Sequence, residues 1–145
     1  DPLMSNESQP ATTTSLFGDV IHRYTRADAL SDGLLIDAGP LARDAGFIWP
    51  VALTTSAWEE CVAWSSTDND LQVYQDVAGR LWDVLVMARH VIDTAPTGAQ
   101  QVTVPINRVP RDGVATTPTL TSLTLVLGPG DTGEPVMTFI KPGED

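Results

Sequence analysis

One stretch of the sequence, from Thr54 to Ala95, decides the fold. It begins Thr54-Thr-Ser-Ala-Trp-Glu-Glu-Cys-Val-Ala-Trp64 and, after a polar gap, continues Tyr74-Gln-Asp-Val-Ala-Gly-Arg-Leu-Trp-Asp-Val-Leu-Val-Met-Ala-Arg-His-Val-Ile92. The stretch holds three of the four tryptophans and the only cysteine. It therefore supplies large apolar side chains for a core, and each contributes about 1.5–3 kcal/mol when it is fully buried.

The second half of this stretch predicts an amphipathic helix. Apolar residues recur at spacings of four, three and four residues, at Leu81, Leu85, Ala88 and Ile92. This is the period of a helix with one buried stripe. Pro96 and Gly98 lie just past the end of the pattern, and Asp76 can cap its start. We expect the helix to be the centre of the domain.

The first half of the stretch predicts a shorter helix. Ser56 followed by Glu59 fits a capping box, in which each side chain satisfies a free backbone N–H. Behind it, Trp58, Cys61 and Val62 supply an apolar face. We interpret residues 65–70 as a short polar link between the two helices.

Length and charge limit what the chain can do. Its 145 residues suit one acidic domain, expected over residues 16–145 after a flexible arm at residues 1–15, where residues 1–3 read as a cloning remnant before a natural start at Met4. Nineteen acidic residues face eight basic ones, a net charge of −11. Phosphate backbones and anionic membranes repel such a chain, so we expect neither direct nucleic-acid binding nor membrane association. A lone cysteine, which cannot close an internal disulfide, fits a cytoplasmic protein.

The acidic surplus has two interpretations. The acids can form an ordinary solvated surface, or they can form a patch that complements a basic surface on another protein. They are spread along the chain rather than gathered in a tail. Only the fold can bring them onto one face, so both interpretations stay open.

The N-terminal half predicts short elements. The segment 16–21 is apolar and is either a strand or an anchoring turn. Thr25 can cap a short helix that Gly33 ends, and Pro40 to Ala45 fits one helical turn. The segment 47–53 is apolar but contains Pro50, so we expect it to be extended and edge-like rather than a central strand.

The C-terminal half predicts a meander of strands. Val102, Val104 and Ile106 alternate with other residues, and Pro105 makes this an edge strand or a bulge. Residues 120–127 alternate with Leu123, Leu125 and Leu127 on the core side. The run Gly128-Pro-Gly-Asp-Thr-Gly133 is a turn, and residues 136–140 form the returning strand. We therefore predict an α+β fold, with an antiparallel sheet of about three or more strands in the C-terminal half packed against the central helix, and short helices in the N-terminal half.

Known chemical motifs are absent from the sequence. His22, Cys61 and His90 show no metal-ligand spacing, so we expect no metal and no cofactor. Cys61 fits a small core residue better than a reactive thiolate. The glycine-rich run 128–133 lacks the Lys-Ser/Thr of a phosphate-binding loop and favours a hairpin turn. Arg108 and Arg111 form a local basic spot, which we interpret as ordinary surface charge.

Four blocks carry a resemblance to a known family. They are Tyr24-Thr-Arg-Ala-Asp-Ala-Leu-Ser-Asp-Gly33, Ala45-Gly-Phe-Ile-Trp-Pro-Val-Ala-Leu-Thr54, Tyr74-Gln-Asp-Val-Ala-Gly-Arg-Leu-Trp-Asp-Val-Leu85 and Gly128-Pro-Gly-Asp-Thr-Gly-Glu-Pro-Val136. The chain resembles a family of small uncharacterised bacterial proteins carried on plasmids, integrative elements and phages. The resemblance implies an accessory gene of a mobile element, and it carries over no catalytic residue. Small acidic proteins from such elements often resemble inhibitors of host restriction or CRISPR defence, some of which mimic DNA.

Two functional hypotheses follow. The first is a protein that binds and inhibits or modulates a basic, nucleic-acid-handling host protein, through surface acids such as Asp68, Asp70, Asp131 and Glu134. The second is a small enzyme or ligand-binding domain with a pocket around the block 74–82. Its candidate residues are Tyr24, Trp49, Tyr74, Asp76, Arg80 and Trp82.

Overall fold

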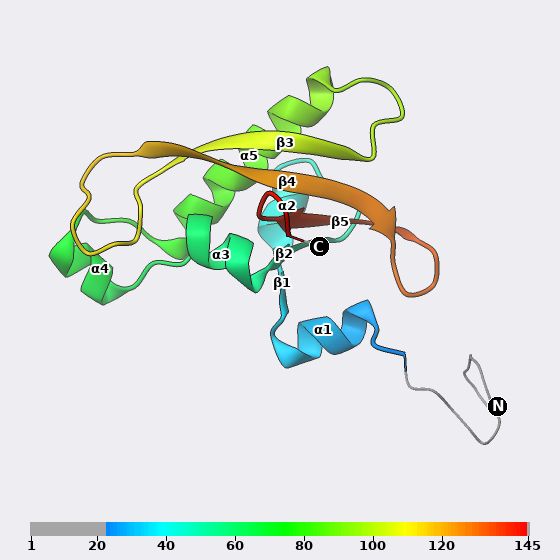
Figure 1. Cartoon of the computed structure of the whole chain (residues 1–145), viewed down its shortest axis with the longest axis horizontal. Coiled ribbons are helices and arrows are strands. Elements are labelled where there is room, and N and C mark those ends of the chain that lie inside the picture. The colour runs from blue at the N-terminus through cyan, green and yellow to red at the C-terminus, as the bar shows by residue number, and fades with distance from the viewer. Residues whose placement is uncertain (1–22, 145) are drawn as a thin grey trace.

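A computed structural model describes residues 23–144, in which the helices lie mostly in the first two thirds of the chain and all strands belong to one sheet (Figure 1). The elements are α1 (Arg26–Asp32), β1 (Leu35–Asp37), α2 (Pro40–Asp44), β2 (Val51–Thr54), α3 (Thr55–Cys61), α4 (Ser66–Leu71), α5 (Val77–Thr94), β3 (Gln101–Arg108), β4 (Thr119–Pro129) and β5 (Pro135–Ile140). The arm expected at residues 1–15, the apolar segment 16–21 and His22 lie outside the described residues.

The five strands form one sheet in the order β1-β2-β5-β4-β3. Three of the four neighbouring pairs are antiparallel, and β2 and β5 run parallel. The register places Leu125 beside Phe139, and Phe139 beside Leu53. These three side chains are almost completely buried. The predicted α+β class is therefore confirmed, and the core lies between this face of the sheet and α5.

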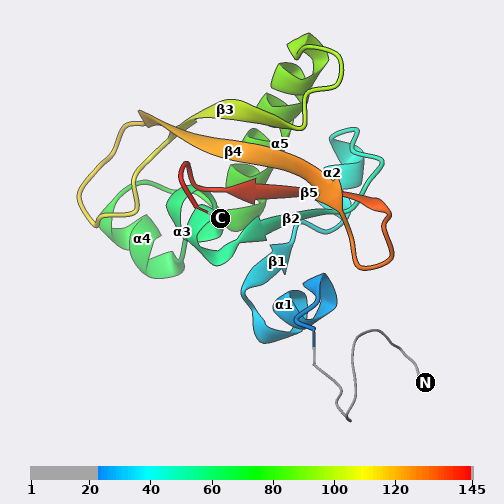
Figure 2. The same cartoon turned by 45° about the vertical axis from the view of Figure 1, so that its right-hand side comes forward.

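Helix α5 is the central helix that the sequence predicts. Its stripe is buried at Leu81, Leu85 and Ala88, while Ile92 packs against the core from its edge. Asp76 caps the helix, because its Oδ1 accepts a hydrogen bond from the Gly79 N–H at 2.7 Å. Figures 1 and 2 show α5 crossing one face of the sheet beneath β3 and β4. The helix thus fixes the layer on which the candidate sites are built.

The C-terminal meander is confirmed. β3, β4 and β5 follow one another as antiparallel neighbours, and β3 is an edge strand, as Pro105 requires. Leu123 and Leu125 face the core, and Leu127 is half-buried. The glycine-rich run closes a hairpin, since Pro129 pairs with Pro135 across it. The hairpin reading is therefore confirmed over the phosphate-loop alternative.

The edge-like reading of residues 47–53 is wrong. β2 is an interior strand between β1 and β5, and Val51, Ala52 and Leu53 are all buried. Pro50 does not interrupt it, because the strand begins one residue later. The Pro50 carbonyl accepts a hydrogen bond from the Met137 N–H at 2.9 Å. A proline just before a strand lacks an N–H, but the strand does not need that donor for its hydrogen bonds to the neighbouring strands.

Two local predictions for residues 56–70 are also wrong. Helix α3 starts before Ser56, because Thr54 is the cap and its Oγ1 accepts from the Ala57 N–H at 3.2 Å. The predicted capping box of Ser56 with Glu59 is therefore not formed. Residues 65–70 are not a plain link, since most of them form α4. The capping box lies there, between Ser65 and Asp68.

The N-terminal predictions hold for α1 and α2. Thr25 caps α1 in a capping box with Asp28, and Gly33 ends the helix with a φ of 79°. That positive φ favours glycine over other residues. Helix α2 starts at Pro40 as expected, since a proline is tolerated in the first turn of a helix.

Candidate functional site

The basic side chains at one end of the sheet are tied into internal ion pairs. Arg108 pairs with the Glu60 carboxylate and also donates to the Glu60 carbonyl at 3.2 Å. Arg111 contacts Asp68 at 2.7 Å and Glu59 at 3.1 Å. These contacts join α3 and α4 to the loop between β3 and β4. Arg108 and Arg111, predicted to be ordinary surface charge, thus hold the structure together instead.

The remaining basic residues are largely used in the same way. Arg26 donates to Thr138 Oγ1 at 2.7 Å, Arg89 pairs with Asp93 at 2.9 Å, and Lys141 lies 3.6 Å from Glu60. With Arg80, described below, six of the eight basic residues make internal contacts. Within residues 23–144, Arg23 and Arg43 are the exceptions. Most basic side chains of the described residues are therefore held by contacts within the chain.

Two pKa shifts at this charged end have clear causes. The hydrogen bond from Arg108 lowers the pKa of the Glu60 carboxyl below its usual 4.5, because it favours the ionised form. Burial raises the pKa of the Cys61 thiol to about 11. Cys61 is 1% exposed and packs in the core. It behaves as the small core residue that the sequence favours.

The four predicted partner-binding acids fall in two separate places. Asp68 and Asp70 lie on α4, whereas Asp131 and Glu134 lie in the turn between β4 and β5, at the opposite side of Figure 1. Asp68 is buried, while Asp70 is exposed. The structure does not gather the four acids into one patch.

The acids of the β4–β5 turn have structural roles. The Asp131 carboxylate accepts from the backbone N–H groups of Arg26 and Ala27, at 2.7 and 3.0 Å, and so anchors the start of α1. Glu134 accepts from the backbone and the hydroxyl of Thr132 and so closes its own turn. Any test of these residues in binding must preserve those contacts.

The six predicted pocket residues do not line one cavity. Tyr24 donates its hydroxyl to Asp32 at 2.8 Å on the surface beside α1. Tyr74 is 81% exposed, and Trp82 lies on the outer side of α5. Arg80, four residues from the Asp76 cap, is buried and lines a small cavity of its own. Trp49 lies elsewhere, in the loop between α2 and β2.

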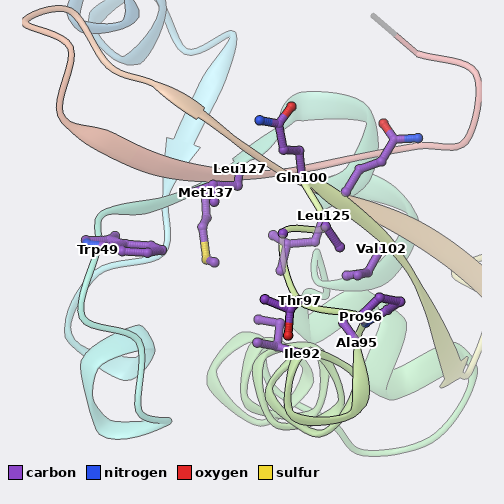
Figure 3. Close-up of a pocket in the computed structure, with 13 residues that line it drawn as sticks. Trp49, Ile92, Ala95, Pro96, Thr97, Gln100, Val102, Leu125, Leu127 and Met137 are labelled. Atoms are coloured by element: carbon purple, nitrogen blue, oxygen red, sulfur yellow. The ribbon is translucent and has the colours of Figure 1, made fainter.

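An apolar cavity opens beside Trp49, where the end of α5 separates from the sheet (Figure 3). Its volume is about 270 Å³. Figure 3 shows the Met137 side chain hanging from β5 between Trp49 and the loop that carries Thr97. The lining comes from three regions, which are the α2–β2 loop, the segment from Ile92 to Val102, and the sheet at Leu125, Leu127 and Met137. An apolar side chain or a small apolar group fits such a hollow.

A second hollow, also lined by Trp49, lies against α2 and the start of β2. It has a volume of about 450 Å³, and its charged lining residues are Asp37, Asp44 and Arg43. The Asp37 carboxylate accepts from the Gly39 N–H at 2.7 Å, while Asp44 forms no hydrogen bond or ion pair within residues 23–144. Trp49 therefore lines both an apolar hollow and a charged one.

The loop that carries Trp49 is held firmly while its apolar side chains face solvent. Phe47 is buried, and its N–H donates to the Ala42 carbonyl at 3.0 Å. Arg89 of α5 lies over the Phe47 ring at 5.7 Å. Beyond this anchor, Ile48 is 76% exposed and Trp49 is 37% exposed. Two neighbouring exposed apolar residues on an anchored loop are typical of a binding surface. We call Ile48, Trp49 and the two hollows the Trp49 surface.

Sequence reasoning named Trp49 but not the surface around it. The pattern of residues 47–53 predicted an extended, edge-like segment. In the structure only Phe47 is buried, and the strand starts at Val51. The signal that marks the loop is Gly46, whose φ of 102° lies in the region that favours glycine.

Residues 23–144 hold no cluster of three or more His, Cys, Asp or Glu residues arranged to bind a metal ion. None of the helices in this part of the chain is long and apolar enough to cross a membrane. The fold and its surface features thus define a small α+β domain with a mixed five-stranded sheet.

Comparison with known proteins gives the family. Residues 15–145 match the model of DUF6573, a family of unknown function, and the chain belongs to that family. No curated protein and no solved structure matches the chain. The match covers the whole of the domain predicted over residues 16–145, and it confirms the resemblance to an uncharacterised family.

Proposed function

We propose that the chain is a non-enzymatic binding protein that uses the Trp49 surface to dock a protein with a basic surface, and so inhibits or modulates it. The observation that supports this best is that Trp49 lines both an apolar hollow and a second one that carries Asp37 and Asp44 beside Arg43. An apolar side chain of the partner enters the hollow beside Met137. A basic side chain of the partner reaches Asp37 and Asp44. Exposed tryptophan flanked by pockets is a common hot spot in protein interfaces.

The charge distribution favours a basic partner. The net charge is −11, and most basic side chains are occupied by internal contacts. A surface of this kind steers a positively charged protein towards it and repels nucleic acid. The partner in this proposal is a protein that itself handles nucleic acid, because such proteins carry the basic surfaces that the acids complement. In that sense the chain is a nucleic-acid mimic.

The finer proposal concerns biological context. The chain is an accessory protein of a mobile genetic element, it acts in the cytoplasm, and its partner is a host defence complex of the CRISPR or restriction type. Its support is the acidic surplus together with the resemblance of the four sequence blocks to proteins of plasmids, integrative elements and phages.

The test is an affinity pull-down of the tagged chain from a bacterial lysate treated with nuclease, read by mass spectrometry. Three variants are run in parallel, which are Trp49→Ala, the pair Asp37→Asn with Asp44→Asn, and Trp82→Ala. Trp82 is the matched control, because its exposure of 38% equals that of Trp49 within one per cent. We expect a stoichiometric partner that the Trp49 and aspartate variants lose at least tenfold and that the Trp82 variant keeps. Equal capture by all variants would remove the Trp49 surface from the proposal.

The acids named from the sequence need a different design. Asp70 is exposed and makes no recorded contact within residues 23–144, so Asp70→Lys reports on binding alone. Asp68, Asp131 and Glu134 bond to the chain itself, so charge reversal there would also disturb the fold. If Asp70→Lys leaves partner binding unchanged, α4 is not part of the interface.

A preparation that captures no partner in a range of lysates would instead favour the ligand-binding hypothesis. Of the residues named for that hypothesis, Arg80 has the most unusual environment, because it is a buried cation with an unpaired donor.

A further inference from the structure

Arg80 is a buried cation at the centre of the charged end. It lies in the first turn of α5 and is 5% exposed. Its Nε donates to the Val62 carbonyl at 3.1 Å, and its Nη1 donates to Gln75 Oε1 at 2.7 Å and to the Val109 carbonyl at 3.0 Å. The guanidinium lies over the Trp64 ring at 4.6 Å. Every one of these partners is neutral.

The charge of Arg80 therefore lacks a counter-ion. Within residues 23–144 no carboxylate forms an ion pair with it, although the same end of the molecule pairs both Arg108 and Arg111. Its Nη2 is buried and has no hydrogen-bond partner in this part of the chain. A buried charge without a partner is costly, and an unmade hydrogen bond to a charged group adds to the cost. A buried donor of this kind takes a partner such as ordered water or a bound anion.

A small cavity adjoins Arg80. It has a volume of about 100 Å³, which exceeds the roughly 30 Å³ that one water occupies in the liquid. Arg80 supplies an unpaired positive charge to its lining, and Arg108, whose charge is paired with Glu60, also lines it. Gln75 and Asn107 supply amides, and Val109 and Pro118 supply apolar surface. Asp83 lies at the same cavity and is exposed. The lining thus combines the unpaired guanidinium of Arg80 with an apolar wall.

We propose that this cavity binds a small carboxylate anion of about the size of acetate. The carboxylate group accepts hydrogen bonds from the free donors of Arg80, and the short alkyl group packs against Val109 and Pro118. Guanidinium and carboxylate groups match in charge and geometry. A fully polar, multiply charged anion such as phosphate suits the site less well, because it has no group for the apolar wall and Asp83 repels it more strongly. This site is independent of the Trp49 surface.

The test measures thermal unfolding at constant ionic strength, with sodium gluconate replaced stepwise by sodium acetate. Gluconate is too large for the cavity and serves as the background anion. We expect Tm to rise with acetate as the stabilisation RT ln(1 + [acetate]/Kd) requires, by about 2–8 °C when acetate reaches ten times its dissociation constant. Chloride and phosphate, titrated in the same way, distinguish a carboxylate from other small anions.

Two variants of exposed residues locate the effect without removing Arg80. Asn107→Asp places a carboxylate at the cavity, and Thr103→Asp makes the same charge change on the same side of β3, away from the cavity lining. We expect the acetate dissociation constant, fitted from the rise in Tm, to increase at least fivefold in the Asn107 variant and to stay within twofold in the Thr103 variant. Asp83→Asn removes the competing carboxylate and should lower that dissociation constant.

Several results would overturn the proposal. They are a Tm that acetate does not raise, equal acetate dissociation constants in the Asn107 and Thr103 variants, and stronger stabilisation by chloride or phosphate than by acetate. A crystal grown in acetate that shows only water at Arg80 Nη2 would overturn it as well. The pull-down with the Trp49 variants is unaffected by any of these outcomes, so failure of this site and failure of the proposed binding function are distinguishable.

Discussion

Strand β3 joins two ends of the molecule that treat charge in different ways. At its Arg108 end, Arg108 and Arg111 are paired with Glu60, Glu59 and Asp68, and α3, α4 and the β3–β4 loop are fastened together. At its Gln101 end, apolar side chains line an open cavity beside Trp49. The same acidic chain thus joins its elements by ion pairs at one end and leaves apolar side chains open to solvent at the other. Ends of these two kinds suit stability and recognition respectively.

The largest expected effect is on the rate at which a reagent modifies the thiol of Cys61, which lies at the charged end. A thiol pKa of about 11, against an ordinary value of 9.0, reduces the reactive thiolate of Cys61 about a hundredfold near neutral pH. Iodoacetamide labelling, followed by mass spectrometry at pH 7.5, should therefore be at least a hundredfold slower than in the urea-unfolded chain. Labelling at the unfolded rate would show that this end opens freely, and the contrast between the two ends would fail.

The second prediction concerns the stability supplied by the ion pairs. Arg108→Ala leaves the Glu60 carboxylate, which is 25% exposed, without its main partner. We expect a loss of about 2–3 kcal/mol in the free energy of unfolding, below the 3–5 kcal/mol typical of a fully buried pair. Urea denaturation measures it. The control is Asp93→Asn, which breaks the exposed Arg89–Asp93 pair and should change stability by less than about 0.5 kcal/mol. Equal losses in both variants would contradict the prediction.

The sequence predicts the helix and strands that carry the charged end better than it predicts the side-chain contacts between them. The apolar periodicity of residues 81–92 identifies α5, and strand alternation identifies β3, β4 and β5, because local pattern and burial agree there. The pairing of Arg108 with Glu60 joins residues 48 positions apart, and no local rule predicts it. The Ser56–Glu59 box was misplaced because two candidate caps, Thr54 and Ser56, lie two residues apart.

The Trp49 end was harder to predict for a related reason. β2 pairs in parallel with β5, which lies more than 80 positions later in the chain, so its interior place depends on the whole topology. A proline at position 50 suggested an edge, although the strand starts after it. Trp49 was singled out by its residue type, but its two hollows come from α2, α5 and the sheet together. The orphaned Nη2 of Arg80 likewise depends on long-range contacts.

The third prediction uses pH to isolate the Glu60 pair. Glu60→Gln should cost about 1.5–2 kcal/mol at pH 7, in line with hydrogen bonds to charged groups. Arg108 holds the pKa of Glu60 below 4.5, so this stabilisation is complete above 4.5 and is lost as pH falls through the lowered pKa. The stability gap between wild type and variant should stay constant from pH 6 to 8 and narrow below about pH 4.5. A gap that widens on acidification would give Glu60 the opposite role.

The smallest expected effect on stability belongs to the Trp49 end, and it sharpens the comparison most. Ile48→Ser changes a side chain that is 76% exposed, so the free energy of unfolding should move by no more than about 0.5 kcal/mol. Val114→Ser is the matched control at the charged end, because Val114 is 78% exposed in the β3–β4 loop. Both variants should keep the wild-type urea midpoint. Only the Ile48 variant should lose captured partner in the pull-down, because only Ile48 adjoins Trp49. Loss of capture in both variants would mean that exposed apolar side chains bind the partner at either end of the molecule. The Trp49 end and the charged end would then not differ in function.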